Sequence, residues 1–144
     1  MSIPATQIQL IKTALLEALP TLKLIYLFGS QAKGTANGSS DWDIAVLPQG
    51  PLDNTLRWDL AQNLASKLGL DVDLVDLSGA STVLQMQVVN DGQLLMGDRQ
   101  EADVFETQVF SMYAHLQESR QDIVDEFVGS LKHEFTHSQQ TLSH

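Results

Sequence analysis

Three aspartates and a glycine–serine pair are the residues of this sequence whose types and spacing suit chemistry. Gly29 and Ser30 follow an apolar run, residues 22–28, which is typical of a buried strand. The chain must turn sharply after such a strand, and glycine permits conformations that expose successive backbone N–H groups. Such groups bind phosphate oxygens, so the pair predicts a turn that holds a triphosphate.

The first two aspartates follow ten residues later, in the sequence Asp41-Trp42-Asp43, and a second apolar run continues to Leu47. Side chains alternate between the two faces of a strand, so Asp41 and Asp43 are expected on the same face. Two like charges repel each other unless a cation lies between them, and hard oxygen ligands suit Mg²⁺. The pattern predicts a site for two Mg²⁺ ions that catalyses phosphoryl transfer.

The third carboxylate, Asp73, lies in the middle of another strand-like run, residues 70–76. Its apolar neighbours indicate an interior position, where an unpaired charge is costly. Pairing with the metals held by Asp41 and Asp43 would remove this cost. Asp73 is therefore predicted as a metal ligand that also helps to remove the acceptor proton, whereas Asp71 has only a weak claim to the site.

A plainer interpretation is that Asp41 only caps a turn after Ser39 and Ser40. This interpretation leaves Asp43 and Asp73 inside apolar strands without partners. The metal site accounts for all three aspartates, and we adopt it.

The order of these motifs resembles the nucleotidyltransferase fold of the DNA polymerase β superfamily, and more closely the minimal nucleotidyltransferase (MNT) antitoxins. The resemblance rests on Gly29-Ser30, ten intervening residues, Asp41-x-Asp43 and then Asp73. It covers roughly residues 4–127. It implies that the three aspartates are the catalytic, metal-binding residues and that ATP is the nucleotide substrate.

The nucleotide-binding residues implied by the resemblance are Gly29, Ser30 and Lys33. Family members usually carry Gly-Ser-x-Ala-Arg-Gly, and here Lys33 stands at the arginine position. Lysine keeps the positive charge but lacks the planar fork of arginine, so its contact with phosphate is expected to be looser. This departure concerns nucleotide affinity and leaves the metal site unchanged.

The resemblance also implies a biological role, because MNT antitoxins are encoded beside HEPN-type ribonuclease toxins. The expected reaction transfers AMP from ATP to a hydroxyl of the toxin, a tyrosine in the family, and so neutralises the toxin. Two alternatives stay open. One is an antitoxin that only binds and covers the toxin, and the other is a nucleotidyltransferase that modifies a small molecule such as an aminoglycoside. The chain length of 144 residues leaves little room for the substrate domain of such small-molecule enzymes.

Composition narrows the class of acceptor. The formal net charge is −10, with 18 Asp and Glu against 8 Lys and Arg, and no basic patch with interleaved aromatic residues is visible. A nucleic-acid acceptor is therefore disfavoured. The acidic balance is ordinary for a soluble domain, and it would also suit a basic protein partner. The sequence has no apolar run long enough for a membrane span and no secretion signal, so a cytoplasmic protein is expected.

Turn residues and apolar periodicity predict an α/β (α+β) fold, in which helices flank a small mixed sheet. The expected domain covers residues 1–128, and a polar tail covers residues 129–144. The elements expected besides the two strands already described are a helix between Pro4 and Pro20, a helix between Asp53 and Gly69, a strand at 70–76, a helix at 81–91, a strand at 93–96 and a long helix beyond Gln100.

The long helix carries an apolar stripe formed by Phe105, Val109, Met112 and Leu116. The stripe is wider than one small sheet requires, so part of it suits a partner surface. The pattern alone favours this interpretation no more than packing on the chain's own domain. The resemblance implies that a C-terminal helical segment helps to engage the toxin.

The tail contains His133-Glu134-x-x-His137, which matches the H-E-x-x-H motif of zinc metalloproteases. On a helix the two histidines would share a face. Only seven residues follow His137, so the segment that supplies a third zinc ligand in such enzymes does not fit. We expect adventitious metal binding at most.

Overall fold

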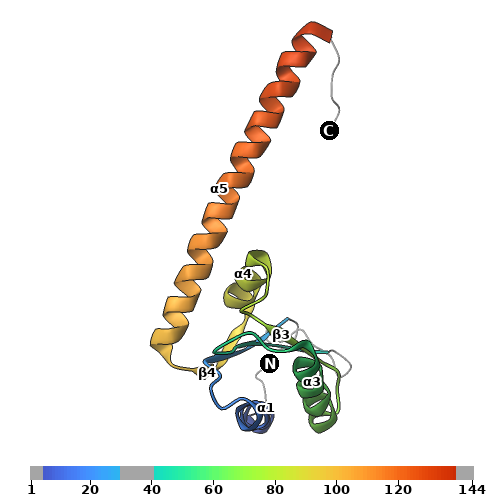
Figure 1. Cartoon of the computed structure of the whole chain (residues 1–144), viewed down its shortest axis with the longest axis vertical. Helices are drawn as coiled ribbons and strands as arrows, with labels where there is room; N and C mark the ends of the chain where they lie inside the picture. The colour runs from blue at the N-terminus through green and yellow to red at the C-terminus, as the bar shows by residue number, and fades with distance from the viewer. Residues whose placement is uncertain (1–4, 30–40, 139–144) are drawn as a thin grey trace.

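A four-stranded mixed sheet lies at the centre of the molecule, with its strands in the order β3-β2-β1-β4 (Figure 1). The computed structural model describes residues 5–29 and 41–138. Strand β1 is antiparallel to both β2 and β4, whereas β2 and β3 are parallel. The strands are β1 (Leu24–Phe28), β2 (Trp42–Leu47), β3 (Val72–Asp76) and β4 (Gln93–Gly97). The predicted small mixed sheet is confirmed.

Helices cover both faces of the sheet. Helices α1 (Ala5–Ala18) and α3 (Asn54–Leu68) pack on one face, and α4 (Thr82–Asp91) and the first turns of α5 (Arg99–Ser138) pack on the other (Figure 1). All five side chains of β1 are buried between these two layers. Strand β1 therefore forms the centre of the core, as its apolar sequence predicts.

The predicted capping residues explain where the helices begin and end. The Asp53 carboxylate accepts hydrogen bonds from the backbone N–H groups of Thr55 and Leu56 at the start of α3. The same helix ends at Gly69, whose φ of +76° lies in the left-handed region. Helix α3 then connects the parallel strands β2 and β3, which cannot be joined by a tight hairpin turn.

Helix α5 has a packed part and a projecting part. Ala102, Phe105 and Val109 are buried against the sheet and α4, whereas Phe110 and Met112 are 44% and 55% exposed. Beyond this point the helix extends away from every other described element (Figure 1). The apolar stripe is therefore divided between the chain's own core and an exposed surface.

The backbone of α5 is helical through Ser138 and so continues across residue 129, where the polar tail was expected to begin. The division of the chain at this residue stays a prediction. At 1.5 Å per residue, the 40 residues of α5 span about 60 Å. No helix within residues 5–29 and 41–138 combines the length and the apolar character needed to cross a membrane.

Candidate active site

Gly29, Asp43 and Asp73 lie side by side at one end of the sheet because of the strand register. Phe28, the residue before Gly29, pairs with Asp43 across β1 and β2, and Asp43 pairs with Asp73 across β2 and β3. The alternation along β2 buries Trp42 on the α1 and α3 side and directs Asp43 toward the opposite face. Three of the residues predicted from the sequence are thus neighbours in space.

Gly29 is required at its position for two reasons. Its φ of +76° is strained for residues with a side chain, and a Cβ placed there would collide with a carboxylate oxygen of Asp43. The Asp43 carboxylate therefore lies directly against the turn that ends β1. The other two predicted nucleotide-binding residues, Ser30 and Lys33, lie outside the described residues.

Gly29, Asp43 and Asp73 form a row across the end of the sheet. Asp43, at its centre, is half-buried. Burial raises the pKa of its carboxyl group, and the nearby negative charges of Asp73 and Asp41 raise it further. Asp73 and Asp41 are thus each close enough to Asp43 to repel its negative charge. A cation among them would relieve this repulsion and favour the ionised form of Asp43.

The expectation that Asp73 occupies an interior position is wrong, because its side chain is exposed. Strand β3 forms an edge of the sheet, and its Leu74 is buried against the α1 and α3 layer. Alternation along the strand directs Asp73 to the opposite face, where no described residue covers it fully. Asp41, just before β2, is also exposed. The cost of a buried charge is therefore no argument for placing Asp73 in the metal site. The strand pairing that sets Asp73 beside Asp43 is a separate argument for it.

The donor chemistry of these residues fits Mg²⁺. Within the described part of the chain, no three His, Cys, Asp or Glu side chains form a cluster ready to hold a metal. Mg²⁺ does not need such a cluster, since it commonly takes one or two protein carboxylates and completes its shell with water and substrate phosphates. Asp43 and its two acidic neighbours therefore suit a Mg²⁺ ion that binds together with a nucleotide.

Two further aspartates near β3 have different surroundings. Asp71 is exposed, and its backbone carbonyl accepts a hydrogen bond of 2.9 Å from the Trp42 backbone N–H. The Asp76 carboxylate accepts hydrogen bonds from the Leu52 N–H at 2.9 Å and from the Ser78 hydroxyl at 2.6 Å. Asp76 therefore holds two loops together at the end of the sheet remote from Gly29.

Comparison with known protein families identifies the fold. Residues 10–101 match the polymerase beta nucleotidyltransferase domain, a span that includes Gly29 and all three predicted aspartates. The chain belongs to the polymerase β nucleotidyltransferase family. It is 54% identical to the protein adenylyltransferase MntA of Shewanella oneidensis over 112 residues, which are 78% of this chain and 81% of that protein. It is 32% identical to MntA of Aphanizomenon flos-aquae over 108 residues, 66% of this chain and 71% of that one.

Solved structures extend the similarity to complexes of this nucleotidyltransferase family. A chain in the crystal structure of a toxin–antitoxin with AMP-PNP superposes with a TM-score of 0.78 and 51% identity, covering 84% of this chain and 98% of its own. A chain of the tri-AMPylated Shewanella oneidensis HEPN toxin in complex with its MNT antitoxin gives a TM-score of 0.73 and 48% identity, covering 85% and 97%. The resemblance to MNT antitoxins that the motifs suggested is confirmed.

Proposed function

We propose that this nucleotidyltransferase transfers AMP from ATP to a tyrosine hydroxyl of a partner HEPN ribonuclease toxin in the cytoplasm, and that the modification neutralises the toxin. The observation that carries the proposal is the row of Gly29, Asp43 and Asp73 in a chain 54% identical to a protein adenylyltransferase. A tri-AMPylated HEPN toxin in the complex of a structural neighbour supports the choice of acceptor.

The arrangement suits attack of an acceptor hydroxyl on the α-phosphorus of ATP. The turn at Gly29 would hold the β- and γ-phosphates through backbone N–H groups, together with Ser30 and Lys33. Mg²⁺ bound by Asp41, Asp43 and Asp73, as two ions, would neutralise the triphosphate charge and polarise the α-phosphate.

The bond from the acceptor oxygen to the α-phosphorus forms while the bond to the bridging oxygen of the β-phosphate breaks, and pyrophosphate leaves. Asp73, exposed at the edge strand, is accessible to an incoming acceptor and takes its proton. The Asp43 carboxylate lies against the turn at Gly29, so the carboxylate row, formed by Asp43 and Asp73, would lie next to the phosphates.

The position of the row favours a protein acceptor. Asp43 faces the side of the sheet that α4 and α5 cover, and α5 projects from that same side with Phe110 and Met112 exposed (Figure 1). A protein that rests on the projecting helix would therefore lie on the side of the carboxylate row. The net charge of −10 would attract a basic partner.

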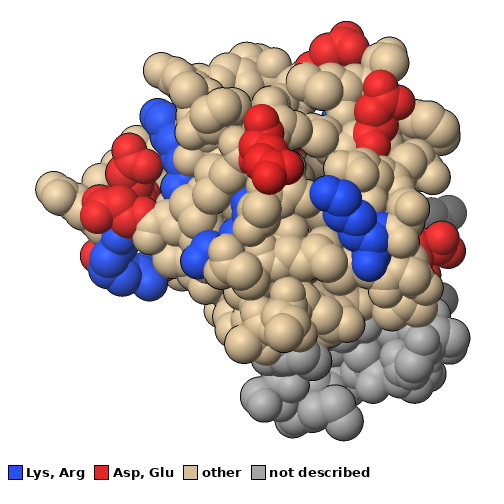
Figure 2. All heavy atoms as spheres, turned by 90° about the horizontal axis from the view of Figure 1, so that it is seen from below, with Lys and Arg blue, Asp and Glu red and all other residues tan. Residues whose placement is uncertain are grey.

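Figure 2 shows the molecule from below, where α1 and α3 cover the sheet. Lys and Arg side chains of the described residues are scattered on this face and separated by acidic and uncharged residues. Binding to a phosphate backbone depends on many adjacent positive charges. This face therefore offers little support for a nucleic-acid acceptor.

A second candidate is an antitoxin that inhibits only by covering the toxin. The exposed Phe110 and Met112 favour it, because an enzyme that acts on a free small molecule has no need of an apolar surface there. Covering and modification predict different behaviour once the two proteins are separated.

The separating experiment incubates the cognate toxin with this protein, ATP and Mg²⁺, and then purifies the toxin under conditions that remove its partner. We expect one or more AMP additions by intact mass and persistent loss of ribonuclease activity, since a phosphodiester bond to tyrosine survives purification. Toxin treated in the same way without ATP serves as the control and should regain activity. Full recovery of the ATP-treated toxin with no added mass would establish the covering mechanism instead.

A matched pair of glycines tests the contact between Gly29 and Asp43. Both Gly29 and Gly69 have φ of +76°, but a Cβ at Gly69 would meet no atom within 4 Å. Gly69→Ala is therefore expected to cost only backbone strain, about 1 kcal/mol, and to lower Tm by about 3–5 °C with normal transfer. Gly29→Ala should lower Tm further and slow transfer about 10²-fold, because the carboxylate must move. Equal transfer rates for the two variants in a discontinuous AMP-transfer assay would show that the contact has no role in the reaction.

A further inference from the structure

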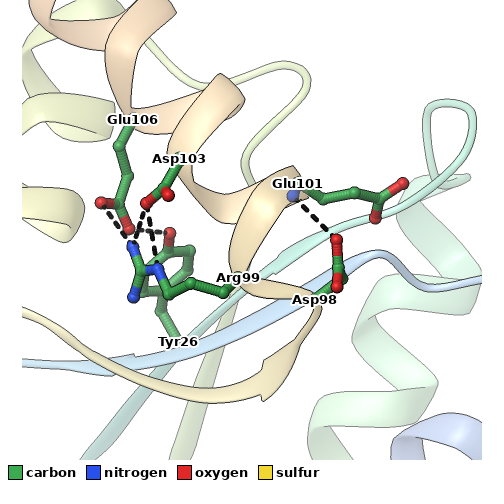
Figure 3. A network of polar contacts seen from close by, with 6 residues as sticks. All are labelled: Tyr26, Asp98, Arg99, Glu101, Asp103 and Glu106. Carbon is green, nitrogen blue, oxygen red and sulfur yellow. Dashed lines mark hydrogen bonds and ion pairs between the residues drawn. The ribbon is translucent and has the colours of Figure 1, made fainter.

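A buried tyrosine joins the central strand to the projecting helix. Tyr26 of β1 is 1% exposed, and its hydroxyl donates a hydrogen bond of 2.6 Å to Oε2 of Glu106 in α5 (Figure 3). Burial raises the pKa of the Tyr26 hydroxyl above its usual range, and the hydrogen bond to Glu106 raises it further. The hydroxyl therefore remains a proton donor at every physiological pH, and the short distance is typical of a charge-assisted bond.

The outer part of this network is exposed. Arg99 contacts Asp103 at 2.8 Å and Oε1 of Glu106 at 3.2 Å (Figure 3). The side chains of Arg99 and Asp103 are each 63% exposed, whereas that of Glu106 is only 20% exposed. Exposed ion pairs constrain a structure weakly, so the bond between Tyr26 and Glu106 is the strong directional link.

This link is distinctive among the contacts of α5. Between residues 99 and 120, no other side-chain hydrogen bond joins α5 to the described strands. The buried residues of α5 in this range are Ala102, Phe105 and Val109, and their packing against the sheet and α4 is apolar. Apolar contacts lack directional preference and leave a helix some freedom to rotate or tilt, whereas a hydrogen bond requires one orientation.

The position of the link would amplify small movements. Glu106 lies one turn before Val109, the last buried residue of α5 between residues 99 and 120, and the helix continues to Ser138. The 29 residues that follow Val109, through Ser138, span about 43 Å at 1.5 Å per residue. A tilt of about 5° at the base would therefore move the far end by about 4 Å. Displacements of about 1 Å at a reacting centre can reduce rates by about 10²-fold.

Tyr26 is also close in sequence to the catalytic end of the sheet. It lies three residues before Gly29 on the strand that ends in the phosphate-binding turn. The same rigid strand thus carries the turn at its end and the anchor of the helix at its centre. The hydrogen bond thus ties the helix to the strand that carries the turn, in addition to the apolar packing of α5 on α4.

We propose that Tyr26 and Glu106 are positioning residues for the acceptor, because their hydrogen bond sets the direction of α5 relative to the turn at Gly29. This inference rests on the proposed transfer of AMP to a partner that docks along α5. A partner on a correctly directed helix presents its hydroxyl to the carboxylate row. The same partner on a tilted helix still binds but presents the hydroxyl in the wrong place.

The kinetic test uses Tyr26→Phe, which keeps the ring and removes only the hydroxyl. We expect kcat for toxin modification to fall about 10-fold, with the KM for ATP and the toxin Kd within about twofold of wild type. Glu106→Leu should lower kcat by a similar factor, and the double variant should be little slower than either single variant. Glu106→Gln should retain a nearly normal rate, because its amide oxygen still accepts the Tyr26 hydroxyl. Asp103→Asn, a change in the exposed pair, is the matched control and should leave kcat unchanged.

A distance measurement tests the direction of the helix without relying on the reaction. The sequence contains no cysteine, so spin labels can be placed through Ser66→Cys on α3 and Gln117→Cys on α5, both exposed positions. In the otherwise wild-type chain and in Asp103→Asn, we expect one narrow distance distribution. In Tyr26→Phe and Glu106→Leu the distribution should broaden or shift by several ångströms.

The outcomes separate this inference from the proposed function. Wild-type distances and rates in both Tyr26→Phe and Glu106→Leu would overturn the positioning role. A parallel loss in kcat and ATP binding would also overturn it, because that pattern indicates general damage to the fold. If the wild-type chain modifies no toxin, the proposed function fails, and the label distances alone decide whether the bond directs the helix.

Discussion

Replacing Asp43 with asparagine is expected to reduce AMP transfer at least about 10⁴-fold while the protein stays folded. Asp43 is the central residue of the row and lies against the turn at Gly29. Asparagine keeps the shape of the side chain but removes the charge that would bind Mg²⁺. Charge stabilisation by a bound metal is worth several kcal/mol, and about 5.5 kcal/mol corresponds to a 10⁴-fold change in rate.

The same substitution should stabilise the metal-free protein. Burial, Asp73 and Asp41 raise the pKa of Asp43 in the folded state above its value in the unfolded chain. The folded state therefore binds the proton more tightly, and stability decreases as the pH rises through the raised pKa. At neutral pH the ionised carboxylate destabilises the metal-free fold, so Asp43→Asn should raise Tm by about 1–3 °C. This gain should disappear at a pH low enough to protonate Asp43 in the wild-type chain.

Metal binding gives a measurement independent of activity. Mg²⁺ with a non-hydrolysable ATP analogue should raise the Tm of the wild-type protein by mass action and should raise that of Asp43→Asn much less. Asp59→Asn, which changes an exposed carboxylate on α3, is the control and should match wild type in rate and in Tm shift. Normal transfer by Asp43→Asn would rule out the assignment of the row as a metal site.

Asp73→Asn is expected to slow transfer about 10³-fold and to leave nucleotide binding largely intact. Loss of a proton acceptor typically costs 10²–10⁴-fold. Asp73 is exposed on the edge strand, so its charge contributes less to the nucleotide site than that of half-buried Asp43. The measurements are single-turnover rates with saturating ATP and toxin, and calorimetric binding of an ATP analogue. The pH dependence of the rate should also change, because the group that accepts the proton is lost.

Asp71→Asn is the matched control for this variant. Asp71 is exposed and lies two residues before Asp73, so its side chain is expected on the same face of the sheet. It lies before the first residue of β3 that pairs with β2, whereas Asp73 pairs with Asp43. We expect a rate within about threefold of wild type, since a surface substitution away from the site has little effect. If Asp71→Asn slowed transfer about 10³-fold and Asp73→Asn did not, Asp71 would take the role assigned to Asp73. Unchanged turnover in both would leave Asp73 with a purely structural role.

The sequence was sufficient to predict the elements because local residues determine them. The Asp53 cap and the left-handed Gly69 bound α3 as expected, and Ser81 caps α4 through the Leu84 N–H. The strand that precedes Gly29 is buried along its whole length, in agreement with its apolar composition. Caps, turns and apolar periodicity act over a few residues, and each is readable without knowledge of distant contacts.

Exposure of the candidate site depended on the tertiary structure. Residues 70–76 have the composition of an interior strand, yet β3 lies at the edge of the sheet and leaves Asp73 exposed. Strand order depends on which strands pair across long separations, and apolar composition does not specify it. The same pairing places Asp43 beside Asp73, although 29 residues separate them in the sequence.

The residues that direct α5 had no recognisable signal in the sequence. Tyr26 reads as one more apolar residue of a buried strand, and Glu106 as one of many acidic residues on a helix, 80 positions away. Likewise, the apolar stripe does not reveal that, between residues 99 and 120 of α5, Val109 is buried in the core whereas Met112 is exposed. Residue types and spacing were enough to predict the family and the local elements, because motifs and caps depend on short-range geometry. The exposure of Asp73, the direction of α5 and the division of its apolar stripe were decided only by the tertiary structure. Each depends on contacts between residues that are distant in the chain.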